Sequence, residues 1–224
     1  MITKEEIGKG YDKIAEKIFV SDDFYNEVLD VESNFHGDIL EAGVGQGVVL
    51  ENIARRGSAH IQSLTGIDLS ERLIAMASAR MPKARILKAD VEAMPFADCS
   101  FDFVVMVDTF QYLQNFDAAL AEIKRVLKPQ GIFLVTVPNK KWILFQSYIA
   151  RRKNIQPVED RFFDFDEMKN LLTQHGFEIL NYRGADAFRF YGARHRWERV
   201  IAKFLPFLQK RMKKIVFRAT VRPR

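Results

Sequence analysis

Residues that build disulfide frameworks and metal centres are scarce in this sequence. It holds one cysteine, Cys99, and four histidines that are scattered without metal-ligand spacing. A single cysteine excludes an internal disulfide framework and a multi-cysteine metal site, so we expect no bound metal. No apolar run approaches membrane-spanning length, and the first residues lack the apolar core of a signal peptide. These absences favour a cytoplasmic protein.

The residues that are abundant suit one well-buried domain. The chain has 224 residues, of which 48% are hydrophobic, and helix-like and strand-like periodicity alternate along it. That alternation predicts an α/β fold. Charge is uneven, because residues 183–224 hold 13 Lys and Arg against two acids, while the remainder holds 21 against 27. An acidic body therefore carries a basic C-terminal end.

Residues 38–50 are the most informative stretch. A short apolar run carries Glu41, is interrupted by Gly43, Gly45 and Gly47, and then resumes. This pattern predicts a strand that leads through a glycine turn into a helix. Glycines accept positive φ and let a ligand lie against bare backbone, and the helix N-terminus offers unpaired N–H groups. An ordinary glycine-rich turn is the alternative to a ligand site.

The spacing of the glycines indicates which ligand this turn would bind. A dinucleotide fingerprint, Gly-x-Gly-x-x-Gly, would need its third glycine where this chain has Val48. The pattern Glu-x-Gly-x-Gly-x-Gly instead resembles the first motif of the class I S-adenosylmethionine (SAM) methyltransferases. In that family the glycine loop passes under the methionine part of the cofactor. The family's acid, matched by Glu41, helps to hold the methionine amino group through bound water or backbone.

The next predicted strand, residues 63–68, ends in Asp68. An acid at this tip can accept both ribose hydroxyls of an adenosine, and we place the neighbouring Leu69 in the same cofactor site. The alternatives are a solvated acid or a helix cap, and Ser70 competes for the capping role. The distance of Asp68 from the glycine loop favours the ribose role.

Residues 89–102 resemble a segment of the small-molecule methyltransferases that include the ubiquinone and menaquinone biosynthesis enzymes. In those proteins the acid after the third strand bonds the adenine amino group, and the next backbone N–H reaches the ring. The matching residues are Asp90 and Val91. A cap on a following helical turn is a second role that Asp90 could combine with adenine binding.

A continuous apolar run, residues 101–107, predicts a central parallel strand buried on both faces. Asp108 follows at its carboxyl end, where open α/β sheets place ligands, so Asp108 through Tyr112 should border the methyl donor. DNA amino-methylating enzymes usually carry an Asn/Asp-Pro-Pro-aromatic tetrapeptide here. It is absent, and no RNA-binding module is visible, so we expect no nucleic-acid partner.

A Tyr-Asp-x-Ile-Ala run begins at Tyr11 and predicts an amphipathic helix over residues 11–19. It resembles the leader that closes over the cofactor in many small-molecule methyltransferases, which makes Tyr11 a candidate cofactor contact. A helix that only packs on the core is the alternative.

The resemblance implies a Rossmann-like, doubly wound sheet with helices on both faces. Seven strands would follow the order 3-2-1-4-5-7-6, with strand 7 antiparallel. Residues 1–224 would form a single domain, with a helical cap at 1–35, a core at 36–183, and lid or acceptor-side insertions at 139–161 and 186–212. Further helices are expected at residues 24–31, 48–56, 71–80, 117–127 and 164–175, strands at 84–89, 132–137, 177–182 and 215–222, and a turn at 128–131.

These features predict a SAM-dependent methyltransferase that acts on a small-molecule acceptor by in-line displacement and releases S-adenosylhomocysteine (SAH). A general base is needed only if the acceptor must lose a proton. Tyr148, His175, Tyr191 and His195 are candidates, but none is assigned as catalytic. Cys99 lacks the Pro-Cys context of a covalent nucleophile. The alternatives are a SAM- or SAH-binding protein without turnover and, disfavoured by Val48, an NAD-dependent oxidoreductase.

The basic end contains apolar residues at helical spacing among lysines and arginines, between residues 194 and 211. It predicts either a lid packed on the core or a surface for anionic lipid or an anionic acceptor. Peripheral membrane contact through this segment is therefore an expectation. Neither the acceptor nor the oligomeric state follows from the sequence.

Overall fold

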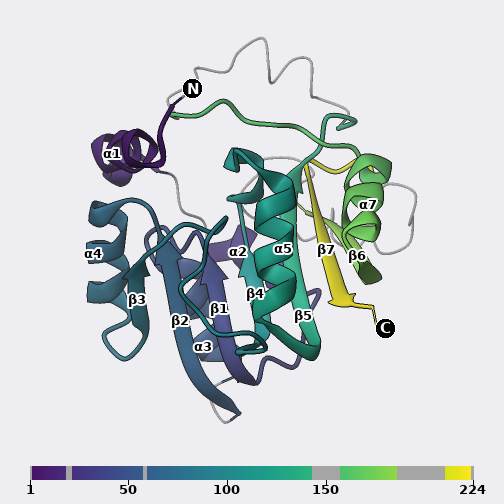
Figure 1. Cartoon of the computed structure of the whole chain (residues 1–224), viewed down its shortest axis with the longest axis horizontal. Coiled ribbons are helices and arrows are strands. Elements are labelled where there is room, and N and C mark those ends of the chain that lie inside the picture. The colour runs from purple at the N-terminus through teal and green to yellow at the C-terminus, as the bar shows by residue number, and fades with distance from the viewer. Residues whose placement is uncertain (1, 19–21, 58–59, 143–156, 186–209, 223–224) are drawn as a thin grey trace.

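The computed structural model describes residues 2–18, 22–57, 60–142, 157–185 and 210–222 (Figure 1). Within them, seven strands form one sheet in the order β3-β2-β1-β4-β5-β7-β6. Strands β1 to β5 pair in parallel, and β7 runs antiparallel to β5 and β6. The predicted fold class and strand order are confirmed. The strands are β1 (Gly37–Ala42), β2 (Ile61–Asp68), β3 (Arg85–Lys88), β4 (Phe101–Met106), β5 (Leu127–Pro138), β6 (Phe177–Ala185) and β7 (Lys214–Val221).

Helices cover both faces of this sheet (Figure 1). One apolar core joins the sheet to α5 and α7, and a second joins its other face to α2 and α3. Central β4 contributes to both, because Val104 and Val105 point to opposite faces and are fully buried. The helices are α1 (Lys4–Ile14), α2 (Asp22–Leu29), α3 (Val48–Gly57), α4 (Glu71–Arg80), α5 (Phe116–Val126) and α7 (Phe165–Gln174), with short 3₁₀ turns η1 (Ala15–Lys17) and η2 (Phe110–Tyr112).

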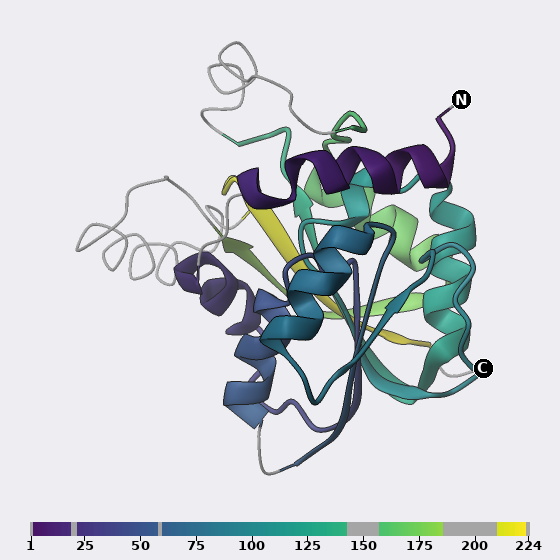
Figure 2. The ribbon, with the colours of Figure 1, turned by 90° about the vertical axis from the view of Figure 1, so that its left-hand side faces the viewer.

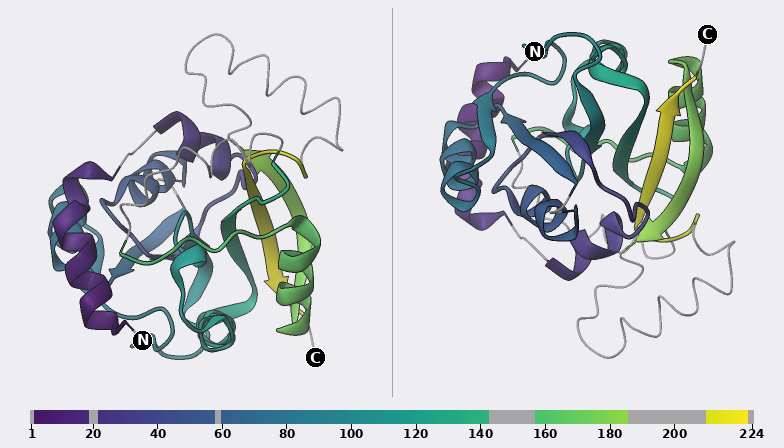
Figure 3. Two further views of the ribbon diagram at one scale, coloured as in Figure 1. Left: turned by 90° about the horizontal axis from the view of Figure 1, so that it is seen from above. Right: turned by 90° about the horizontal axis from the view of Figure 1, so that it is seen from below.

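Helix α1 lies outside the two layers. It packs next to α4, at the edge towards which the parallel strands point (Figures 1 and 2). Seen from above, α1 and α4 occupy one end of the molecule and α7 the other (Figure 3). The arrangement places α1 beside the loops that follow β2 and β3.

Two local predictions differ from the structure. The N-terminal helix begins at Lys4 rather than at Tyr11, because Thr3 and Glu6 form a capping box that starts it earlier, and the 3₁₀ turn η1 continues it to Lys17. The turn expected at 128–131 falls within the range of β5, but the registers with β4 and β7 skip these four residues. Phe101 faces Leu127, Phe103 faces Ile132, and Gln130 has φ +65°, so the chain makes a local excursion inside the strand.

The other predicted helix and strand ends within the described residues agree with the structure to within about two residues, the usual uncertainty of such boundaries, with two exceptions: β5 begins at Leu127 rather than at 132, and β6 ends at Ala185 rather than at 182. In the part of the chain that the structure describes, no helix is both long and apolar enough to cross a membrane. The insertion expected at 139–161 lies largely outside the described residues, as does nearly all of the basic segment at 186–212.

Candidate functional site

The predicted site residues gather at one edge of the sheet. The glycine loop connects β1 to α3, Asp68 is the last residue of β2, and Asp90 and Asp108 each come two residues after a strand, β3 and β4. Parallel strands bring their carboxyl ends to a common edge, where open α/β sheets bind ligands. The sequence prediction of where these residues lie is thus consistent with the fold, while their roles remain predictions.

The three glycines of the loop differ in the space that surrounds them. Gly43, Gly45 and Gly47 have φ of +82°, +50° and +78°, which side chains rarely adopt. A Cβ on Gly43 would lie 2.2 Å from Thr109 Oγ1, and one on Gly47 would lie 3.1 Å from Ala77 Cα. A Cβ on Gly45 would meet nothing within 4 Å. Packing therefore requires the outer two glycines, and Gly45 borders open space in which a ligand can approach its backbone.

Asp68 connects the tip of β2 to this loop. Its Oδ2 accepts the Gly45 N–H at 2.9 Å, and its Oδ1 accepts the Ser70 N–H at 3.0 Å. Burial raises the pKa of Asp68, and these N–H groups oppose the rise. The helix cap belongs to Ser70, whose Oγ accepts the Leu73 N–H. With the Leu69 N–H, three of the roughly four acceptor positions of a carboxylate are occupied, so Asp68 can still accept a further donor such as a ribose hydroxyl.

Glu41 is a buried acid with an unsatisfied oxygen. The residue is 2% exposed, and its Oε2 has no hydrogen-bond partner among the residues that the structure describes. Burial raises the pKa of Glu41 well above its usual range, the Leu50 N–H opposes this, and the charge of Asp68 adds to it. A buried carboxyl oxygen without a hydrogen-bond donor is costly, and an ammonium group would satisfy it. This donor requirement fits the methionine part of SAM.

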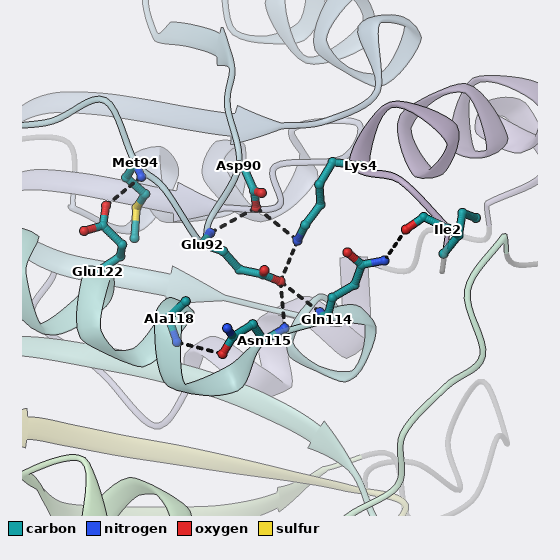
Figure 4. Close-up of polar contacts among 9 residues, drawn as sticks. All are labelled: Ile2, Lys4, Asp90, Glu92, Met94, Gln114, Asn115, Ala118 and Glu122. Atoms are coloured by element: carbon teal, nitrogen blue, oxygen red, sulfur yellow. Dashed lines mark hydrogen bonds and ion pairs between the residues drawn. The ribbon is translucent and has the colours of Figure 1, made fainter.

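Asp90 belongs to a network that reaches α1 (Figure 4). Its Oδ1 accepts the Glu92 N–H at 3.0 Å and lies 3.4 Å from Lys4 Nζ. The same ammonium lies 2.5 Å from Glu92 Oε1. Glu92 also accepts the N–H groups of Gln114 and Asn115. Sequence reasoning missed Lys4, because its partners are more than 80 residues away and its helix was placed too late.

Val91 and Leu69 lie in the two loops beside these acids. The Val91 side chain is 7% exposed and packs in the core, so only its backbone could face a ligand. Leu69 follows Asp68, and its N–H also lowers the pKa of that carboxyl group. A Cβ on Gly8 of α1 would lie 2.5 Å from the Leu69 carbonyl oxygen, so α1 packs directly on the loop.

Tyr11 points from α1 towards the same edge. Its hydroxyl is buried and has no hydrogen-bond partner within the described residues. Its ring packs edge-on against Tyr112, with centroids 5.9 Å apart. Burial raises the pKa of Tyr11, and the charges of Asp160 and Asp68 raise it further. The role of Tyr11 as a residue that covers the cofactor remains a prediction.

Two more contacts attach this N-terminal segment to the site. Asp12 Oδ1 accepts the Ser70 hydroxyl at 2.5 Å and the Arg72 N–H at 3.0 Å. Gln46, between the second and third glycines of the loop, donates its side-chain amide to the Ala15 carbonyl at 2.9 Å. Helix α1 and η1 are thereby tied to the loops after β1 and β2.

Asp108 lies at the other end of the site. It has φ +53°, its N–H donates to Thr136 Oγ1, and its Oδ1 is 2.6 Å from Lys214 Nζ. The amide of Gln111 donates to the Asp108 carbonyl, and its own Oε1 has no partner within the described part. Burial raises the pKa of Tyr25 on α2, and the charges of Asp108 and Glu41 raise it further. The sequence analysis identified neither Lys214 nor Tyr25.

The structure rules out one candidate base. His175 follows α7 and precedes β6, so it lies at the opposite edge of the sheet, where its Nε2 is 3.0 Å from Asp117. Tyr148, Tyr191 and His195 lie outside the described residues. Within the described residues no cluster of His, Cys, Asp and Glu could hold a metal ion. A groove of about 530 Å³, lined by residues such as Ser63, Arg85 and Phe96, lies at the edge of the sheet opposite the candidate site.

Comparison with known proteins agrees with this geometry. Residues 40–135 match the methyltransferase domain family. The matched range runs from β1 through most of β5, and it contains every predicted cofactor residue except Tyr11.

The chain is similar to a probable S-adenosylmethionine-dependent methyltransferase of Mycolicibacterium smegmatis, with 32% identity over 159 residues, 70% of this chain and 56% of that protein. It is 26% identical to a demethylmenaquinone methyltransferase of Tropheryma whipplei over 171 residues, 65% of this chain and 68% of that one. Among the first curated relatives, the chain spans about half of their length. A solved Thermotoga maritima SAM-dependent methyltransferase shares the fold, with a TM-score of 0.69, 22% identity, and 96% and 99% of the two chains covered.

Proposed function

We propose that this chain, which carries a class I SAM-dependent methyltransferase domain, transfers a methyl group from SAM to a small-molecule acceptor and releases SAH. One observation carries the proposal: the unpartnered Oε2 of Glu41 lies next to a glycine loop whose middle residue, Gly45, borders open space. A ligand that carries an ammonium group beside a portion that lies against the loop backbone would satisfy both features. SAM has that chemistry.

The proposed binding roles follow the strand order. Glu41 would accept the methionine ammonium group, the glycine-loop backbone would face the same part of the ligand, and Asp68 would accept the ribose hydroxyls. Asp90 would accept the adenine amino group, with the Val91 N–H next to the ring. Tyr11 and Leu69 would cover the adenosine, and Asp108 would border the transferred methyl group.

When bound, SAM supplies a methyl group that its positive sulfur has already activated. The chain's contribution to an in-line displacement is therefore mainly alignment and the exclusion of water. Glu41 would hold the methionine part, and Asp68 and Asp90 would hold the adenosine part. Binding at these separate points would orient the methyl group. Asp108, whose Oδ1 is 2.6 Å from Lys214 Nζ, would border the methyl group on the side from which the acceptor approaches. No residue is assigned as general base.

The acceptor class is proposed only as a small molecule, either soluble or amphiphilic. The strongly basic C-terminal end favours an anionic or amphiphilic acceptor, and peripheral membrane contact remains a prediction. Sedimentation with anionic vesicles at low salt tests that contact, and no binding would remove it. We expect no nucleic-acid substrate.

Calorimetric titration with SAM and SAH, with NAD(H) as control, tests the proposed cofactor. Micromolar affinity for both adenosyl ligands and none for NAD(H) is the expected result. Binding of NAD(H) alone would instead support the oxidoreductase. SAH formation with a panel of small acceptors then tests turnover, and tight cofactor binding with no transfer to any of them would favour a binding protein of methyltransferase fold.

A further inference from the structure

We propose that Lys4 is a positioning residue that makes the adenine subsite selective for a 6-amino group. It would do so by fixing the Asp90 carboxylate in one orientation. The inference rests on the proposed function, which places adenine against Asp90. Lys4 lies before the matched family range and outside every motif of the sequence.

The position of Lys4 in α1 is unfavourable unless it has partners. Thr3 is the N-cap, so Lys4 is the first helical residue, where the helix dipole disfavours a cation. The acids Glu5 and Glu6 in the same turn have the favourable sign. Lys4 Nζ lies 2.5 Å from Glu92 Oε1 and 3.4 Å from Asp90 Oδ1, and about 29% of its side chain is exposed. These two carboxylates offset the unfavourable placement.

The two oxygens of Asp90 are used unequally. Oδ1 accepts the Glu92 N–H and faces Lys4, while Oδ2 accepts no hydrogen bond from the residues that the structure describes. The carboxylate is thus held through one oxygen and presents the other. A free carboxylate oxygen only accepts hydrogen bonds. It suits the two N–H groups of adenine and repels the 6-oxo group of hypoxanthine.

Glu92 makes this arrangement rigid. Besides Lys4, it accepts the backbone N–H groups of Gln114 and Asn115 at 2.8 and 3.1 Å. Asn115 in turn caps α5, and the Gln114 side chain donates to the Ile2 carbonyl at 2.7 Å. The start of α1, the loop after β3 and the loop before α5 are therefore joined around Lys4 (Figure 4). Removing the ammonium group leaves two carboxylates side by side and frees Asp90 to turn.

The test compares SAH with S-inosylhomocysteine, in which oxygen replaces the adenine amino group, by titration of the full chain. For Lys4→Met, we expect SAH affinity to fall about tenfold and S-inosylhomocysteine affinity to change less than about threefold, as for loss of one charge-assisted interaction. Lys9→Met is the matched control, since Lys9 is on the same helix and pairs with exposed Glu5. It should leave both affinities unchanged.

A second variant separates selectivity from folding. Asp90→Asn replaces the acceptor with an amide that can also donate, so it should shift preference towards S-inosylhomocysteine in folded protein. An equal loss of both ligands in Lys4→Met, or no loss of either, would overturn the role of Lys4. Wild-type protein that binds neither ligand would instead count against the proposed function, so the two failures are distinguishable.

Discussion

Lys214, the first residue of β7, places its ammonium group 2.6 Å from the Asp108 carboxylate that follows β4. Strand β5 lies between the two, and its Thr136 accepts the Asp108 N–H. Because β7 is antiparallel, its beginning lies at the edge where β4 ends. The Lys214 side chain is 13% exposed, and Asp108 is its one recorded ionic partner within the described residues.

Lys214→Met should destabilise the folded chain. It leaves the partly exposed Asp108 carboxylate without its cation, and a loss of about 1–2 kcal/mol in the free energy of unfolding is expected after solvent screening. Urea unfolding measures it. Adding Asp108→Asn should recover part of the loss, because no uncompensated charge then remains. Additive effects of the two substitutions would show that the pair does not interact.

Gly45→Val should impair cofactor binding more than folding. Its Cβ would enter the open space next to the loop, although φ +50° adds backbone strain of about 1–3 kcal/mol. We expect SAH affinity to fall beyond detection while the circular dichroism spectrum keeps its native form.

Gly43→Val gives the contrast within the same loop. A Cβ there would lie 2.2 Å from Thr109 Oγ1, so the folded state itself should be lost or strongly destabilised. Unchanged SAH affinity in folded Gly45→Val would sink the assignment of the glycine loop.

Asp68→Ala should weaken SAH binding by about 1.5–3 kcal/mol if its carboxylate accepts the ribose hydroxyls. It also removes the acceptor for the Gly45 and Ser70 N–H groups, so thermal stability should fall as well. Ser70→Ala is the control: it removes the α4 cap, at a cost of about 1 kcal/mol, and the hydroxyl that donates to Asp12, but it keeps the backbone N–H that donates to Asp68. Equal effects of the two substitutions on SAH affinity would argue against the ribose role.

The sequence was informative wherever a signal is local. The acids at strand ends follow from motifs whose residues lie within a few positions of one another, and the strand order follows from the family that these motifs resemble. The early start of α1 also has a local signal, the capping box formed by Thr3 and Glu6. His175 could have been excluded too, because a helix that precedes a parallel strand ends at the edge away from the site.

The contacts of Lys4 and Lys214 had no such signal. Lys4 meets Asp90 across 86 positions and Lys214 meets Asp108 across 106, and each depends on how a segment outside the central parallel strands is placed. The orphaned Glu41 oxygen was equally inaccessible, because burial of a particular atom depends on packing by α3 and neighbouring side chains. The sequence pattern predicts where the candidate site lies, and tertiary packing determines the hydrogen bonds and charges around it.

Glu41→Gln tests the electrostatics of the site through pH. Since burial raises the pKa of Glu41 in the folded chain, the folded state binds more protons than the unfolded state above the usual glutamate range. Stability of the ligand-free wild type should therefore fall as pH rises through that range and up to the raised pKa. Glutamine does not titrate, so the substitution removes this loss of stability with rising pH. The melting temperature of Glu41→Gln should therefore exceed that of wild type by a margin that grows with pH.

Ligand binding should show the opposite trend. The SAH ammonium group favours ionised Glu41, so wild-type affinity should rise with pH up to the raised pKa and binding should release protons, seen as a dependence of the calorimetric enthalpy on buffer. The pKa of Asp68 is also raised, so the comparison of wild type with Glu41→Gln separates the pH dependence of SAH affinity that is due to Glu41 from that due to Asp68. The variant should bind SAH about 10–100-fold more weakly, with a flatter pH profile. An identical profile in both proteins would mean that the ammonium group binds elsewhere.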